Sequence, residues 1–141
     1  MWLTPKRKIG LRQTIIWIGV LAFTILFREI YYYNSHGVYS DYMTYIWIAP
    51  LVLLSVYLIA SFLFQIDFGE WGRLGFNAGV GTIIVYQAIR GVYEIARVEP
   101  ENSVDVRWSP FFLVMGIVAI LFGIIFSAFH IAKAKKEKEN L

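Results

Sequence analysis

The chain has 141 residues, of which 58% are hydrophobic and only 16% are charged, with a formal net charge of +3 at neutral pH. An ordinary soluble domain is about half apolar and about a quarter charged, which excludes that class. The chain has no cysteine, which excludes disulfide bridges and thiolate metal sites, and its basic residues gather at the ends of apolar stretches, so we expect no nucleic-acid partner.

Four long apolar stretches account for most of the sequence, at residues 14–33, 43–64, 74–96 and 108–132. About 20 apolar residues in a helix match the roughly 30 Å hydrocarbon core of a bilayer. An isolated strand in lipid cannot pair its backbone groups, so each stretch should be a helix. The sequence therefore predicts an all-α integral membrane protein: one domain of four transmembrane helices in an up-down bundle, surrounded by lipid.

Basic residues flank the first and the last stretch, and the bias of lysine and arginine sets the orientation of a membrane protein. We therefore expect a multi-pass protein of the cell membrane with both termini cytoplasmic, carrying short basic tails. The lysine- and glutamate-rich segment after Ala132 should fray into solvent. The basic residues of the tails are Lys6, Arg7, Lys8 and Arg12 at one end and Lys133, Lys135, Lys136 and Lys138 at the other.

The first two spans carry few polar groups. Arg28 and Glu29 lie near the outer end of the first span, where Arg28 is about 21 Å along the helix from Thr14 at 1.5 Å per residue. Pro50 lies a few residues into the second span, where it either kinks that helix or marks a later start.

The loop between the second and third spans contains Asp67, Glu70 and Arg73. No histidine accompanies the two carboxylates, so we expect a plain solvated turn and no metal. The two histidines, His36 and His130, should lie near opposite faces of the membrane and cannot hold one metal ion together. We accordingly expect no cofactor.

The third span carries a stripe of unusual composition. Gly75 and Gly79 share one face because they are four residues apart, and small residues let another helix approach closely. The stripe continues outward through Thr82, Tyr86, Arg90 and Glu94, with Gln87 beside it. A polar face of this kind cannot point at lipid, so it should face another helix or a watery cavity.

Charges of both signs occur at one level of two spans. Arg90 is about 24 Å along the third span from Leu74, close to the depth of Arg28 on the first. We therefore predict crossed ion pairs in the outer leaflet, joining Arg28 to Glu94 and Arg90 to Glu29. Tyr86 and Gln87 are further candidates for this polar network or for a ligand-binding site.

The fourth span is almost purely apolar between Phe111 and Phe129. Gly116 and Gly123 are seven residues apart on one face and suit close helix packing. His130, at the inner end, is expected to contact lipid headgroups or the last helix carbonyls.

The residues show no catalytic signature, and we name no catalytic residue. The function that fits best is an accessory or interaction subunit of a membrane complex, joined to a larger membrane protein or to copies of itself. One alternative is a small homo-oligomeric transporter or channel with a polar path along the third span. A second is an outer-leaflet binder of lipid headgroups, or a membrane enzyme, that uses Arg28, Tyr86 and Arg90.

Overall fold

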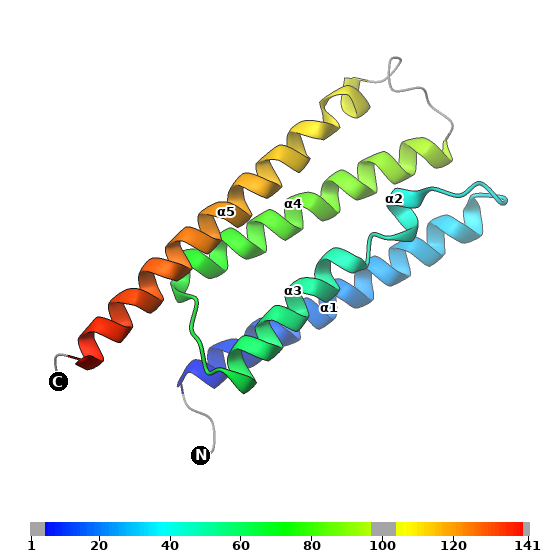
Figure 1. The fold of residues 1–141 in the computed structure, drawn as a ribbon. Coiled ribbons are helices and arrows are strands. Elements are labelled where there is room, and N and C mark those ends of the chain that lie inside the picture. Colours follow the sequence, from blue (N-terminus) through cyan, green and yellow to red (C-terminus); the bar gives the residue numbers. More distant parts are fainter. Residues whose placement is uncertain (1–4, 97–103, 140–141) are drawn as a thin grey trace.

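The regular structure of the protein is helical throughout the described part of the chain. The computed structural model describes residues 5–96 and 104–139. Figure 1 shows three long helices and a broken segment between the first two of them. In chain order the elements are α1 (Pro5–Asn34), α2 (Asp41–Thr44), α3 (Ile48–Leu58), the π-helical turn η1 (Ile59–Leu63), α4 (Gly69–Ile95) and α5 (Val104–Glu139).

Within the described residues, three helical segments are long and apolar enough to cross a membrane. They cover Lys8–Asn34, Asp41–Leu63 and Arg107–Glu137. The prediction of an all-helical protein is thus confirmed, and three of the four predicted spans coincide with these segments. The remaining predicted span, residues 74–96, falls largely in α4, which is long enough but is not among the segments apolar enough to cross a membrane.

The helices form two antiparallel hairpins, one made by α1 with α3 and one made by α4 with α5. In Figure 1 the Pro5 end of α1 and the Glu139 end of α5 lie at the same end of the bundle, which is called the terminal end below. Helix α4 packs along α5 on one side and contacts α2 and α3 on the other, whereas α5 packs mainly on α4. Helix α4 is therefore the element that joins the two hairpins.

The second predicted span is a broken helix. Pro50 is buried and lies in the first turn of α3, where a missing N–H costs no helical hydrogen bond, so it marks a later start. At the other end the chain widens into η1, in which the Phe64 N–H donates to the Ile59 carbonyl at 3.3 Å. Gln65 then adopts a left-handed conformation with φ 50° and ends the span.

Two helices extend beyond the predicted spans. Helix α1 begins at Pro5, because proline is well suited to a first helical position. Helix α5 continues to Glu139. The expectation that the chain frays after Ala132 is therefore wrong for residues 133–139. An ion pair between Lys135 and Glu139, at 4.0 Å and four residues apart, supports this last part of the helix.

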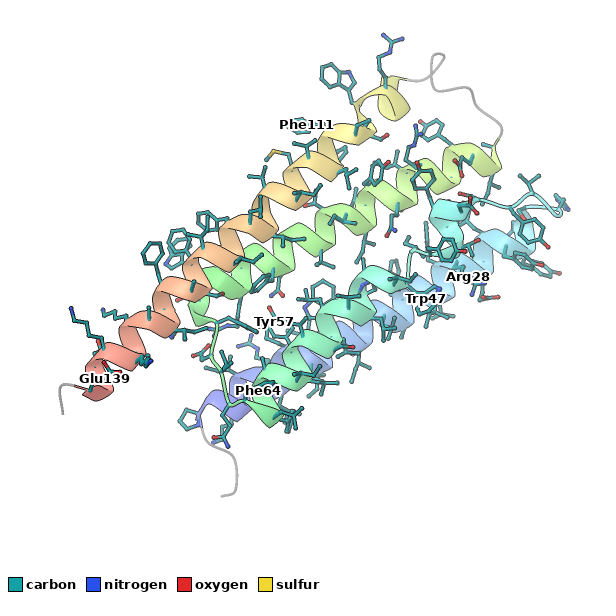
Figure 2. All side chains as sticks on the ribbon, in the orientation of Figure 1. Arg28, Trp47, Tyr57, Phe64, Phe111 and Glu139 are labelled. Carbon is teal, nitrogen blue, oxygen red and sulfur yellow. The ribbon has the colours of Figure 1, made fainter. Side chains whose placement is uncertain are left out.

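The core lies where α1, α3 and α4 meet. Its buried members are Trp17 from α1, Leu53, Leu54 and Tyr57 from α3, and Val80 from α4. Figure 2 shows Tyr57 between its own hairpin and α4. The two largest of these side chains carry polar atoms, so the centre of the protein needs hydrogen-bond partners as well as packing.

Candidate functional site

Glycines form the contact between α4 and α5. A Cβ atom added at Gly75 would lie 2.6 Å from the Cα of Gly123, and one added at Gly79 would lie 2.7 Å from the carbonyl oxygen of Gly116. The four glycines named from the sequence thus meet in one seam, with the backbones of the two helices in direct contact. Because no side chain fits there, the seam holds the two helices at a fixed separation and in one register.

The seam continues toward the terminal end of the bundle. At Gly72 an added Cβ would meet the Oγ of Ser127 at 2.1 Å. The Ser127 hydroxyl in turn donates to the carbonyl oxygen of Phe68 at 3.1 Å. A hydroxyl on an apolar helix is therefore used to fix the beginning of α4 against α5.

The charged residues at the opposite end pair differently from the prediction. Arg28 forms an ion pair with its neighbour Glu29 at 3.2 Å, and Glu94 accepts a hydrogen bond from the Ser40 hydroxyl at 2.5 Å. The predicted crossed pairs are therefore wrong. The loop before α2 folds back onto α4 and supplies Ser40 as the partner of Glu94. The position of a residue along its span does not predict where such a loop lies.

Arg28 on α1 and the end of α4 nevertheless lie at a similar level of the bundle, as predicted. A small cleft of about 100 Å³ is lined by Arg28 and Tyr32 of α1, by Ser40, and by Ile95 of α4. The Asn34 end of α1 and the Ile95 end of α4 therefore both lie beside the chain that precedes α2.

Arg90 is held by an aromatic side chain. Its guanidinium carbon lies 5.4 Å from the centre of the Tyr42 ring, and that ring meets Tyr86 edge-on at 5.7 Å. The Nε of Arg90 and the Oε1 of Gln87 are buried and have no hydrogen-bond partner among the described residues. Tyr86 and Arg90 thus form a polar group with α2, and Gln87 lies on the same helix within one turn of them.

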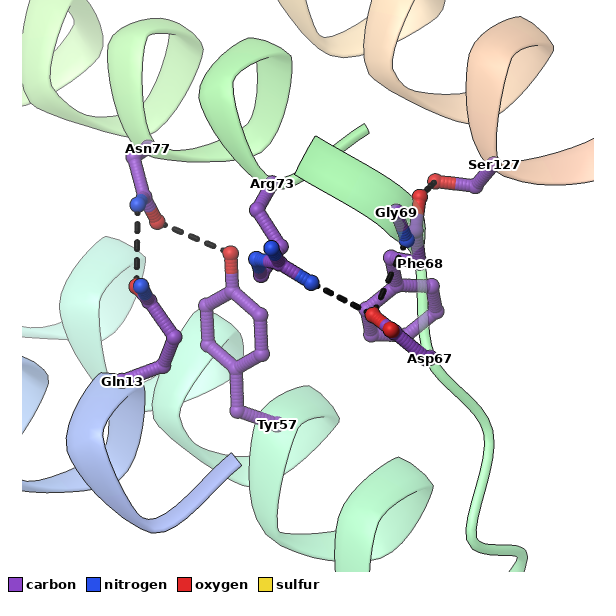
Figure 3. A network of polar contacts seen from close by, with 8 residues as sticks. All are labelled: Gln13, Tyr57, Asp67, Phe68, Gly69, Arg73, Asn77 and Ser127. Atoms are coloured by element: carbon purple, nitrogen blue, oxygen red, sulfur yellow. Dashed lines mark hydrogen bonds and ion pairs between the residues drawn. The ribbon is translucent and has the colours of Figure 1, made fainter. Parts of the chain in front are cut away.

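A polar network absent from the predictions lies near the other end of the bundle (Figure 3). The Oδ1 of Asn77 accepts hydrogen bonds from the Trp17 indole N–H and from the Tyr57 hydroxyl, each at 2.9 Å. The Asn77 Nδ2 donates to the Oε1 of Gln13 at 2.9 Å. One side chain of α4, itself partly buried, therefore binds α1 and α3 together beside the core residues Trp17 and Tyr57.

The turn before α4 is more ordered than expected. Asp67 forms an ion pair with Arg73, and both side chains are largely buried. A second contact of Asp67 is the backbone N–H of Gly69, which donates to its Oδ1 at 3.0 Å. The prediction of a plain solvated turn is wrong for Asp67 and Arg73. The Asp67 carboxylate accepts a hydrogen bond from the first residue of α4 and also neutralises the guanidinium of Arg73.

Sequence reasoning missed the Asn77 network because its members are far apart along the chain. Asn77 is 64 residues from Gln13 and 60 from Trp17. The available signal was Asn77 itself, an amide in an apolar helix on the face opposite the glycines. Such a group needs a partner in lipid, and the polar atoms of tryptophan and tyrosine are natural ones.

An apolar layer separates the polar groups at the two ends. Between Asn77 and Gln87 lie Val80, a member of the core cluster, and Ile84, which packs against that cluster. Asn77 and Gln87 are about 15 Å apart along the helix at 1.5 Å per residue. The hydroxyl of Thr82, in the same stretch, donates to the Ala78 carbonyl of its own helix at 2.7 Å. The described side chains therefore provide no continuous polar path along α4.

Within the described residues, no three histidine or acidic side chains gather closely enough to hold a metal ion. No protein-family model matches the sequence, and no curated protein or solved structure matches it either.

Proposed function

We propose that the protein is an accessory or interaction subunit of a membrane complex. The observation that carries the proposal is that polar side chains inside the described part of the bundle bond to its other parts and do not line a channel. Asn77 joins α4 to α1 and α3, Asp67 fixes the turn before α4 to that helix, and Val80 and Ile84 between the polar groups are apolar. Such an interior suits a rigid scaffold better than a conduction path through a single copy.

We further propose that α4 also crosses the membrane, as the third of four spans in chain order. Its least apolar residues are covered by neighbours: Asn77 by α1 and α3, and Arg90 by Tyr42. Polar groups on a membrane helix are tolerated when they face the bundle interior. With four spans the termini lie on one side, and the lysine and arginine bias makes that side cytoplasmic.

The surface available to a partner is the outside of the bundle. Side chains on the face of α5 turned away from α4 are exposed along its length, and Phe111 in Figure 2 projects away from the other helices. The described exterior also carries the Arg28–Glu29 ion pair, in which the Glu29 side chain is 57% exposed. An exposed ion pair at the end of an apolar helix gives a partner a polar point of attachment as well as an apolar face.

The test is co-purification from native membranes in a mild detergent. We expect the tagged chain to carry a discrete partner or a second copy of itself. A photo-crosslinking residue at Val118, which is 53% exposed on α5, should form one defined adduct.

A matched pair of variants makes the test specific. Arg28→Gln with Glu29→Gln removes the outer ion pair and should weaken the association. Lys136→Gln with Glu137→Gln removes one exposed charge of each sign from α5 and should leave the association intact. A clean monomer with no adduct, obtained from the unaltered chain, would contradict the proposal.

A further inference from the structure

The terminal end of the bundle has two clefts on either side of His130. One, of about 280 Å³, lies between the chain before α4 and the last turns of α5, and Lys135 lines it. The other, of about 210 Å³, lies against the first turn of α4, and Lys133 lines it. His130 lines both clefts and is therefore at the centre of this face.

The position of His130 depends on a glycine. Gly69 has φ +71°, and a Cβ atom added there would lie 2.9 Å from the imidazole ring of His130. The absence of a side chain at this left-handed position lets the start of α4 lie directly beside the ring. The wall that separates the two clefts is therefore a built feature of the fold.

The larger cleft has an apolar floor and basic groups at its edge. Ile66, Ile131 and Ala134 supply the apolar surface, while His130 and Lys135 supply the polar groups. Asp67 also lines the cleft, but its carboxylate is paired with Arg73 (Figure 3). The charge of Asp67 is therefore already compensated. Lys135 also lies 4.0 Å from the Glu139 carboxylate of its own helix, but this pair is exposed and long, so Lys135 can turn to an anion in the cleft at little cost.

The depth of this cleft matches the headgroup level of a bilayer. The apolar part of α5 ends at Ala132, and the lysines begin directly after it. Trp71, on the first turn of α4, is 59% exposed and lines the neighbouring cleft. Tryptophan prefers the membrane interface, so both clefts open where phosphate groups of one leaflet are found.

We propose that the cleft lined by Ile66, His130, Ala134 and Lys135 binds the phosphate headgroup of an anionic phospholipid. The phosphate lies between His130 and Lys135, and the first carbons of the acyl chains lie on Ile66 and Ile131. Basic pockets beside membrane helices bind anionic headgroups in this way. The same phosphate chemistry occurs in free inorganic phosphate, but the apolar floor of the cleft favours the lipid.

The experiment measures thermal unfolding of the full chain in neutral detergent, with phosphatidylglycerol or phosphatidylcholine of the same chain length added. We expect the anionic lipid to raise the melting temperature and the neutral lipid to have a much smaller effect. Lys135→Gln should weaken the apparent affinity for phosphatidylglycerol about fivefold, because one basic group is removed from the site. Native mass spectrometry should show fewer retained anionic lipids for the same variant.

Two further variants separate a site from diffuse charge. Lys136→Gln removes the same charge from a residue that lines neither cleft, and it should leave the affinity unchanged. Ala134→Phe keeps every charge but fills the cleft, and it should abolish the effect of the lipid. Both positions lie on the last turns of α5, so native circular dichroism should be retained.

Three results would overturn the proposal. An equal loss in Lys136→Gln and Lys135→Gln would show general attraction to a charged surface. A full effect of lipid on Ala134→Phe would place the lipid elsewhere. An equal rise in melting temperature with inorganic phosphate alone would assign the site to the free anion and not to a lipid.

Discussion

The Asn77 network allows a quantitative prediction of stability. Asn77→Leu keeps the size of the side chain but removes its three hydrogen bonds to Gln13, Trp17 and Tyr57. Hydrogen bonds between membrane helices average about 0.6 kcal/mol and reach about 1.7 kcal/mol, so the variant should lose about 2 kcal/mol and at most about 5 kcal/mol. Trp17 and Tyr57 are 4% and 1% exposed, so water cannot replace the lost acceptor, and the loss should not be negligible.

The assay is reversible unfolding by increasing mole fraction of a denaturing detergent in mixed micelles, followed by circular dichroism. Thr82→Val is the matched control, because that hydroxyl bonds only to a carbonyl of its own helix. A double-mutant cycle of Asn77→Leu with Tyr57→Phe should give a coupling of about 0.5 kcal/mol or more. If Asn77→Leu is as stable as Thr82→Val, the network does not hold the hairpins together and the reasoning fails.

Other substitutions test the helix seam and the outer polar group. Gly75→Ala places a Cβ atom 2.6 Å from the α5 backbone and should cost about 1–3 kcal/mol in the same assay, whereas Gly81→Ala meets nothing within 4 Å and should be neutral or stabilising. A similar loss in both variants would mean that helix propensity and not contact decides the result. Arg90→Met should lose about 0.5–2 kcal/mol with the contact to Tyr42. Adding Glu94→Gln should not restore it, because Glu94 is bound to a serine hydroxyl; restoration would point to direct pairing of the two charges.

The sequence predicted the helical class and the apolar segments well, because hydrophobic length is a local property. The ends of the helices were less predictable. Pro5 extends α1 and the Lys135–Glu139 pair extends α5, and both effects are local but weak beside the apolar signal. The break within the second span depends on the fit of Pro50 and η1 to the first hairpin, which no local pattern contains.

The polar contacts were predictable only in part. The spacing of Gly75 and Gly79 indicated a packing face, and the structure places that face on α5. The depth of Arg28 and Glu94 was also a useful guide, but depth does not decide pairing. Ser40 reaches Glu94 first because the loop before α2 folds onto α4, and a loop conformation depends on contacts across the whole fold.

The position of Asn77 has a consequence for biosynthesis. The groups that it binds all precede it in the chain, and the nearest, Tyr57, is made 20 residues earlier. At translation rates of about 5–20 residues per second, the first hairpin waits one to several seconds before its acceptor emerges. During that interval the Trp17 indole and the Tyr57 hydroxyl lack the acceptor that the finished protein gives them, so the first hairpin is less stable alone than it is once α4 has packed against it.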